Sequence, residues 1–112
     1  IKIYHNPKCS KSRAGVCLLE EQQIPFETIK YLDTPLEKKE IEQIIKLLGV
    51  APIALVRQKE AIWIENFKNK QITDDQIITA LSTYPKLIER PIVINGNKAV
   101  IARPTERINE IL

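Results

Sequence analysis

The first 32 residues follow a strand–helix–strand pattern, which restricts the possible folds more than any later stretch. IKIY is a short run with two β-branched residues that Asn6-Pro7 ends, and residues 26–32, FETIKYL, alternate as a second strand. Good helix formers fill residues 10–23, and Ile24-Pro25 stops them. Because such a crossover joins neighbouring strands in the same direction, we expect the two strands to be parallel.

A strongly marked helix start follows this unit. Thr34 is a capping residue, Pro35 fits the first helical position, and Glu37 lies three residues after the cap. An apolar stripe continues to Leu48, and Gly49 stands where a left-handed residue would end the helix. The segment 50–69 has a weaker pattern, in which IALVR and AIWIENF are candidate short helices.

The remaining residues predict a helix, a hairpin and a final helix. Residues 73–76 form a second box-like start, for a helix that ends before Pro85. Two β-branched runs flank Asn95-Gly96, a common signal for a tight hairpin. Pro104 opens a last helix through Leu112.

This order of elements, β-α-β, a helical middle and β-β-α, is the thioredoxin layout. We therefore expect an α/β, thioredoxin-like fold with a mixed four-stranded sheet. A chain of 112 residues is the size of one ordinary domain, and its branched aliphatic residues can fill one core. Residues 1–112 are accordingly predicted to form a single domain.

Charge and cysteine content limit the possible partners. A formal charge of +3 without a block of like charges fits a small anionic substrate better than a nucleic acid. The chain has neither 18 consecutive apolar residues nor a signal-peptide pattern, so we expect a cytoplasmic protein that does not enter membranes. In a reducing compartment its two cysteines are reactive or incidental rather than bridged.

Cys9 is the residue whose surroundings point to chemistry. It lies between the first strand and the first helix, among Lys8, Lys11 and Arg13. A helix N-terminus and fixed cations both lower the pKa of a thiol, and the unpaired N–H groups of the first turn can hold an oxyanion. The alternative is a small buried hydrophobe, which the polar, basic neighbourhood argues against.

Cys17 has a different expected role. It falls with Ala14 and Leu18 on the apparent apolar side of the helix, so packing explains it. Eight helical residues separate it from Cys9 by about 12 Å, which exceeds the roughly 7 Å limit for a disulfide. Disulfide chemistry at Cys9 therefore needs a thiol from another molecule.

Several other classes of site do not fit the sequence. A phosphatase loop has an arginine six residues after its cysteine, where this chain has Gly15. Ser12 takes the place of a second cysteine, which excludes a C-x-x-C dithiol. One histidine and two distant cysteines make no zinc site. His5 could hydrogen-bond near Cys9 or be structural, and the sequence leaves both readings open.

The segment YHNPKCSKSR resembles the Y-H-N-P-x-C-x-x-S-R motif of glutaredoxin-dependent arsenate reductases. Two later blocks, TDDQIITAL and ERPIVINGNKAVIARPTE, are similar to further parts of that family in the same order. The resemblance implies that a Cys9 thiolate attacks arsenate, that glutathione and glutaredoxin complete its reduction to arsenite, and that no cofactor is bound. It also implies a role in arsenic resistance.

The resemblance further implies that three arginines hold the oxyanion, and the matching positions are Arg57, Arg90 and Arg103. A guanidinium stays charged and offers paired donors to two oxygens of a tetrahedral anion. In thioredoxin-like folds the proline before the third strand is commonly cis and faces the thiol, so Arg90-Pro91 is expected to be cis. Ser12 and Arg13 match the motif as well and, with His5, are expected to support the loop or the thiolate.

Two alternatives remain open at the sequence level. One is a regulatory protein like the Spx-type regulators, which use a related fold to contact RNA polymerase but typically carry C-x-x-C near the N-terminus. The other is a thiol reductase of the same fold that acts on another oxyanion or on a mixed disulfide. Whichever of these functions applies, we expect a monomer.

Overall fold

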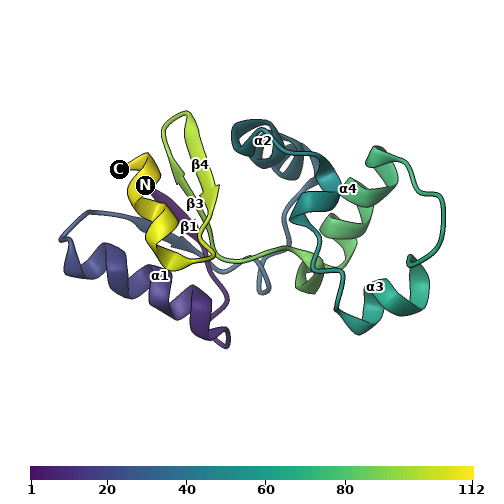
Figure 1. Ribbon diagram of the computed structural model, residues 1–112, viewed down its shortest axis with the longest axis horizontal. Helices are drawn as coiled ribbons and strands as arrows, with labels where there is room; N and C mark the ends of the chain where they lie inside the picture. The colour runs from purple at the N-terminus through teal and green to yellow at the C-terminus, as the bar shows by residue number, and fades with distance from the viewer. The chain divides into compact units, whose positions relative to one another are not determined.

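The expected strand–helix–strand unit is present in the computed structural model, which describes residues 1–112 (Figure 1). It consists of β1 (Lys2–Tyr4), α1 (Ser10–Glu21) and β2 (Glu27–Ile29). Strands β1 and β2 pair in parallel, with Ile3 opposite Thr28, as predicted. The second strand is shorter than its alternating pattern indicated.

Two C-terminal strands complete the sheet, β3 (Ile92–Asn95) and β4 (Lys98–Ile101). The strand order is β2-β1-β3-β4, and β3 runs antiparallel to both of its neighbours. The predicted mixed four-stranded sheet is therefore confirmed. The hairpin turns at Gly96 and Asn97, one residue later than Asn95-Gly96, and Gly96 has the positive φ of 62° that this turn requires.

Register and helix packing together build one core on this sheet. Ile3, Val93 and Val100 are cross-strand partners and are buried. Leu19 of α1 packs against them, as do Ile108 and Ile111 of the last helix. That last helix, η3 (Thr105–Ile111), is a 3₁₀-helix rather than an α-helix. Its three-residue turn places Ile108 and Ile111 on the same side, facing the core.

The chain forms two compact units, one made of residues 1–34 and 90–112 and the other of residues 35–89. The sheet, α1 and η3 belong to the first unit, and the helical middle of the chain is the second. The expectation that all 112 residues act as one domain stays a prediction. None of the helices is both long and apolar enough to cross a membrane.

The first helix of the second unit is α2 (Lys38–Leu48), and the predicted helix start at Thr34 is wrong. Glu37 is the N-cap residue. The cause is a tertiary contact: Leu36 is buried, and its carbonyl oxygen accepts a hydrogen bond from Ser82 Oγ at 2.7 Å. The predicted end is correct, because Gly49 is left-handed with φ of 68°.

The rest of the second unit consists of η1 (Pro52–Leu55), α3 (Ala61–Asn66), α4 (Asp74–Thr83) and η2 (Pro85–Leu87). The two short helices expected within 50–69 are thus present, the first as a 3₁₀-helix. The capping box is confirmed: Thr73 N–H donates to Gln76 Oε1 at 2.8 Å, and Gln76 N–H donates to Thr73 Oγ1 at 3.2 Å.

Candidate active site

The loop between β1 and α1 is held by Asn6. The Asn6 side-chain oxygen accepts the Lys8 N–H at 3.0 Å, and its carbonyl oxygen accepts the Cys9 N–H at 3.0 Å. The Asn6 N–H donates to Ser12 Oγ at 2.9 Å. Sequence reasoning treated Asn6 only as a strand breaker. Its signal was available, since asparagine before proline commonly folds back on its own backbone in a turn.

These bonds place Cys9 at the N-cap position of α1. Its backbone is extended, and its carbonyl oxygen accepts the Arg13 N–H at 3.0 Å, which starts the helix. The N–H groups of the first helical turn have no intrahelical acceptor and gather at this end. Cys9 is half-buried rather than enclosed in the core, which argues against a purely packing role for it.

Cys9 has a thiol pKa below its ordinary value, as the sequence predicted. Burial by itself raises the pKa, but hydrogen bonds to the sulfur outweigh this effect. Their donors are the Ser12 backbone N–H, the Arg90 side chain and the Lys11 backbone N–H, and the Arg90 charge lowers the pKa further. The thiolate is therefore the favoured form at a lower pH than for an ordinary cysteine.

Two of the three predicted arginines lie at the same end of the sheet as Cys9. Arg90 immediately precedes β3, Arg103 follows β4, and these strands pair with Ile92 opposite Ile101. Arg103 Nη1 donates to the carbonyl oxygen of Arg90 at 3.2 Å. The Arg90-Pro91 bond is cis as predicted, and the Arg103-Pro104 bond is cis as well.

Arg57 belongs to the second unit, where it lies between η1 and α3. Its backbone N–H donates to the Leu87 carbonyl oxygen at 2.7 Å. Its Nε is 3.6 Å from a Glu60 carboxylate oxygen, and this buried nitrogen has no hydrogen-bond acceptor. The role of Arg57 at Cys9 stays a prediction.

His5 and Ser12 form a buried polar pair beneath the loop. His5 Nδ1 lies 3.0 Å from Ser12 Oγ, and Ser12 is fully buried. Burial lowers the pKa of His5, and the charges of Lys30 and Arg13 lower it further, which outweighs the raising effect of Ser12. A neutral imidazole can accept the Ser12 hydroxyl proton at Nδ1. The pair thus supports the loop that carries Cys9.

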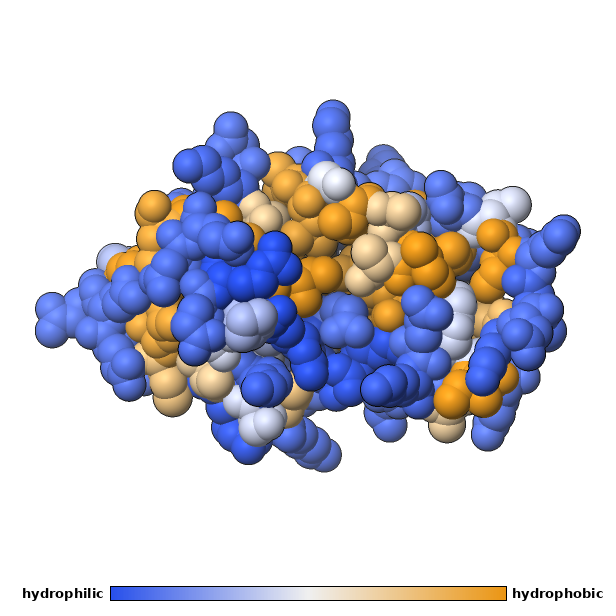
Figure 2. Space-filling model, viewed as in Figure 1, coloured by the Kyte–Doolittle hydropathy of each residue, from blue (hydrophilic) through white to orange (hydrophobic).

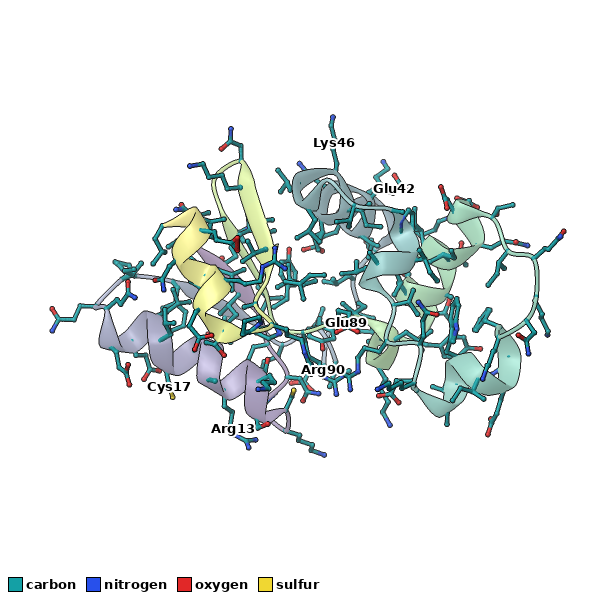
Figure 3. The ribbon with its side chains drawn as sticks, viewed as in Figure 1. Arg13, Cys17, Glu42, Lys46, Glu89 and Arg90 are labelled. Atoms are coloured by element: carbon teal, nitrogen blue, oxygen red, sulfur yellow. The ribbon has the colours of Figure 1, made fainter.

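Arg13 supports the same loop from outside. Its Nη1 donates to the Pro7 carbonyl oxygen at 2.8 Å, and the rest of the side chain is exposed. Figure 3 shows Arg13 on the side of α1 that faces away from the sheet.

The predicted packing role of Cys17 is wrong, because this residue is exposed. Figure 3 shows it on the outer side of α1. The buried residues of α1 are Ser12, Gly15 and Leu19. The pattern of apolar residues did not predict this buried side, because two of its residues, Ser12 and Gly15, are small rather than apolar.

Comparison with known proteins connects this site to one family. A model of the ArsC family matches residues 4–111. The chain is 43% identical to a protein named arsenate reductase from Neisseria meningitidis serogroup A, in an alignment that covers all of this chain and 97% of the relative. It is 41% identical to an arsenate reductase from Haemophilus influenzae, with 98% of this chain and 97% of the relative covered.

The solved structure of an arsenate reductase from Vibrio cholerae is similar throughout. It shares 45% sequence identity with this chain and superimposes with a TM-score of 0.94, covering 98% of this chain and 95% of that one. Family model, curated relatives and structural likeness all span nearly the whole sequence. The chain therefore belongs to the ArsC family, with the thioredoxin-like fold that its motifs predicted.

Proposed function

We propose that this protein reduces arsenate to arsenite, with Cys9 as the nucleophile and with glutathione and glutaredoxin as reductants. Relatives named arsenate reductase support the substrate. The observation that carries the mechanism is the hydrogen bond from the Arg90 side chain to a sulfur at the N-cap position of α1. This arrangement favours a thiolate and puts a cation where an oxyanion must approach it.

In the first proposed step the Cys9 thiolate attacks arsenic and forms a sulfur–arsenic bond. One arsenate oxygen leaves as water after taking up protons from solvent, so arsenic stays in the +5 state. Arg90 faces the sulfur and would donate to an arsenate oxygen as the bond forms. Further donors are the unpaired N–H groups of the first turn of α1.

In the second step a glutathione thiolate attacks the Cys9 sulfur. The sulfur–arsenic bond breaks, and its electron pair stays on arsenic, which becomes arsenite. Cys9 is left in a mixed disulfide with glutathione, so two thiols have lost the two electrons that arsenic gained. Glutaredoxin then exchanges with this disulfide and returns Cys9 to the thiolate.

The proposal assigns supporting roles to Arg103 and Arg57. Arg103 anchors the Arg90 backbone through its bond to the carbonyl oxygen and keeps further donors for the anion. Arg57 is proposed as a third anion ligand on its motif alone, and its buried, acceptor-free Nε is compatible with that role. We propose that the protein is cytoplasmic, because the cytoplasm keeps glutathione reduced. We also propose that it acts as a monomer.

Arsenate reduction coupled to glutathione and glutaredoxin tests the proposal. Cys9→Ser should abolish turnover, whereas Cys17→Ser should leave it unchanged because Cys17 is exposed on the outer side of α1. Arg90→Ala should lower kcat/KM for arsenate by roughly tenfold to a hundredfold, the range for losing a charged hydrogen bond of about 1.5–3 kcal/mol. Arg107→Ala is the matched control, since Arg107 is occupied by Glu110 at 3.0 Å.

Turnover that survives Cys9→Ser would disprove the covalent mechanism. If the wild-type protein shows no arsenate turnover but its Cys9 is readily glutathionylated, the thiol chemistry stands and the substrate is another oxyanion or a mixed disulfide. An unreactive Cys9 would instead favour a regulatory role.

A further inference from the structure

Exposed positive charge is concentrated on the residues that neighbour Cys9 in the sequence. The first 19 residues contain four Lys or Arg and no Asp or Glu. Three of these cations, Lys8, Lys11 and Arg13, lie within four positions of Cys9 and are exposed; we call them the cationic rim. In the view of Figure 2, hydrophilic side chains lie over this N-terminal end of α1.

No residue of the cationic rim takes part in an ion pair. The ion pairs of the structure involve other cations, and the only side-chain bond of the rim joins Arg13 to the Pro7 carbonyl oxygen. The charges that act on the neighbouring side chains are also all positive. Lys30 and Arg13 act on His5, and Arg90 acts on Cys9.

The rim and Arg90 are placed for different tasks. Arg90 is only half exposed and donates to the sulfur itself, where an oxyanion would bind. Lys8 and Lys11 are exposed and lie one and two positions from Cys9 in the sequence. At 0.1 M salt the Debye length is roughly 10 Å, so their charges can act on an ion that approaches Cys9.

We propose that the cationic rim, chiefly Lys8 and Lys11, favours thiols that carry carboxylates, as glutathione does, when a second thiol attacks the Cys9 sulfur. This inference rests on the proposed role of Cys9 as the nucleophile that a second thiol resolves. The attacking species is the thiolate, and apart from its sulfur glutathione is negative, 2-mercaptoethanol is neutral and cysteamine is positive. The attraction to Lys8 and Lys11 should therefore be strongest for glutathione and weakest for cysteamine.

A thiol-exchange assay without arsenate tests this selection. Cys17→Ser protein is first reacted with Ellman's reagent, since exposed Cys17 would otherwise react as well, which leaves Cys9 disulfide-bonded to thionitrobenzoate. The added thiolate attacks the Cys9 sulfur, the old disulfide breaks, and coloured thionitrobenzoate leaves with the electron pair. The second-order rate constants are measured for glutathione, 2-mercaptoethanol and cysteamine.

The variant is Lys8→Gln/Lys11→Gln, with Arg13 kept because it holds the Pro7 carbonyl. We expect the glutathione to 2-mercaptoethanol rate ratio to fall about threefold to tenfold at low salt, the scale of two exposed charge interactions. The cysteamine to 2-mercaptoethanol ratio should rise. Both differences should fade near 1 M salt, where the Debye length is about 3 Å. Because each comparison is a ratio of rate constants for two thiols, a change in the reactivity of the Cys9 disulfide that affects both thiols equally cancels.

Lys2→Gln/Lys98→Gln is the matched control for the same loss of charge. Both lysines are exposed in the first unit, and the register puts them at the other end of the sheet, where Lys2 faces Ile94 and Lys98 faces Asn95. Equal effects in both double variants, or an unchanged ratio in the rim variant, would overturn the proposal. Because the assay contains no arsenate, its result is independent of whether arsenate is the substrate.

Discussion

At the scale of single residues, the pKa of the Cys9 thiol depends on how its sulfur is solvated. Burial disfavours its thiolate, and two backbone N–H groups with one guanidinium reverse that effect. The backbone donors are fixed by the N-cap position, so they are lost only if α1 frays. Arg90 is the contribution that a side-chain substitution can remove.

The pH dependence of Cys9 alkylation should therefore respond to Arg90. In a Cys17→Ser background, the wild-type rate of reaction with iodoacetamide should reach half its plateau at a pH below that of an ordinary thiol. Removing the Arg90 donor and charge should move this midpoint upward. At a pH below both midpoints, Arg90→Ala should then react about threefold to tenfold more slowly. A hydrogen bond to a charged group contributes about 1.5–3 kcal/mol, and the half-buried position of Cys9 reduces this contribution.

Arg107→Ala provides the control for this measurement, because its charge is paired with Glu110. An unchanged midpoint in Arg90→Ala would mean that the backbone donors alone hold the thiolate. The role of Arg90 would then be limited to the anion.

At the scale of elements, the close approach of α1 to the sheet depends on Gly15. A Cβ at this position would lie 3.2 Å from Ile3 Cδ1, 3.2 Å from Pro91 Cγ and 3.7 Å from Ile108 Cδ1. All three neighbours are buried. The same residue that distinguishes this loop from a phosphatase loop therefore sets the spacing between α1, β1 and the segment that follows Arg90.

Gly15→Ala should destabilise the protein by about 1 kcal/mol, measured as the free energy of unfolding in urea. Alanine gains about 1 kcal/mol of helix propensity, but overpacking a tight core costs about 1–3 kcal/mol. Ile3→Val removes the Cδ1 atom that the new methyl group meets. The loss of unfolding free energy in the double variant should therefore be smaller than the sum of the two single losses, by at least about 0.5 kcal/mol. Strict additivity would show that Ile3 is not the obstacle.

At the scale of the whole molecule, the first unit is discontinuous in sequence, since residues 35–89 are inserted between its two parts. Each unit carries its own probe. Trp63, the only tryptophan, is buried in the second unit, and Cys9 lies in the first. These probes allow the single-domain prediction to be tested directly.

Trp63 fluorescence and the initial rate of Cys9 alkylation should give the same urea midpoint in a Cys17→Ser background. The alkylation rate should change on unfolding, because the donors that lower the thiol pKa are then lost. A chain of 112 residues that folds as one domain unfolds in a single cooperative transition, so probes in both units must report the same equilibrium. Two distinct midpoints would show that residues 35–89 unfold separately and would refute the single-domain prediction.

The amino-acid sequence determined the features that act over a few residues. β-Branched runs, prolines and Gly49 predicted the positions of the strands and the ends of the helices. The sequence of residues 73–76 predicted the capping box of α4, and the position of Cys9 at a helix start was also predicted. Each of these signals is local, because a cap, a turn or a fixed φ depends on neighbours within one helical turn.

Only the tertiary structure decided between local alternatives and joined distant residues. It moved the start of α2 to Lys38 because Ser82 takes the Leu36 carbonyl, and it buried the Gly15 side of α1 rather than the Cys17 side. It also brought Arg90 to the Cys9 sulfur, which the strand register makes possible by pairing Tyr4 with Ile92. These outcomes depend on packing and hydrogen bonds between segments far apart in the chain, and no local pattern encodes them.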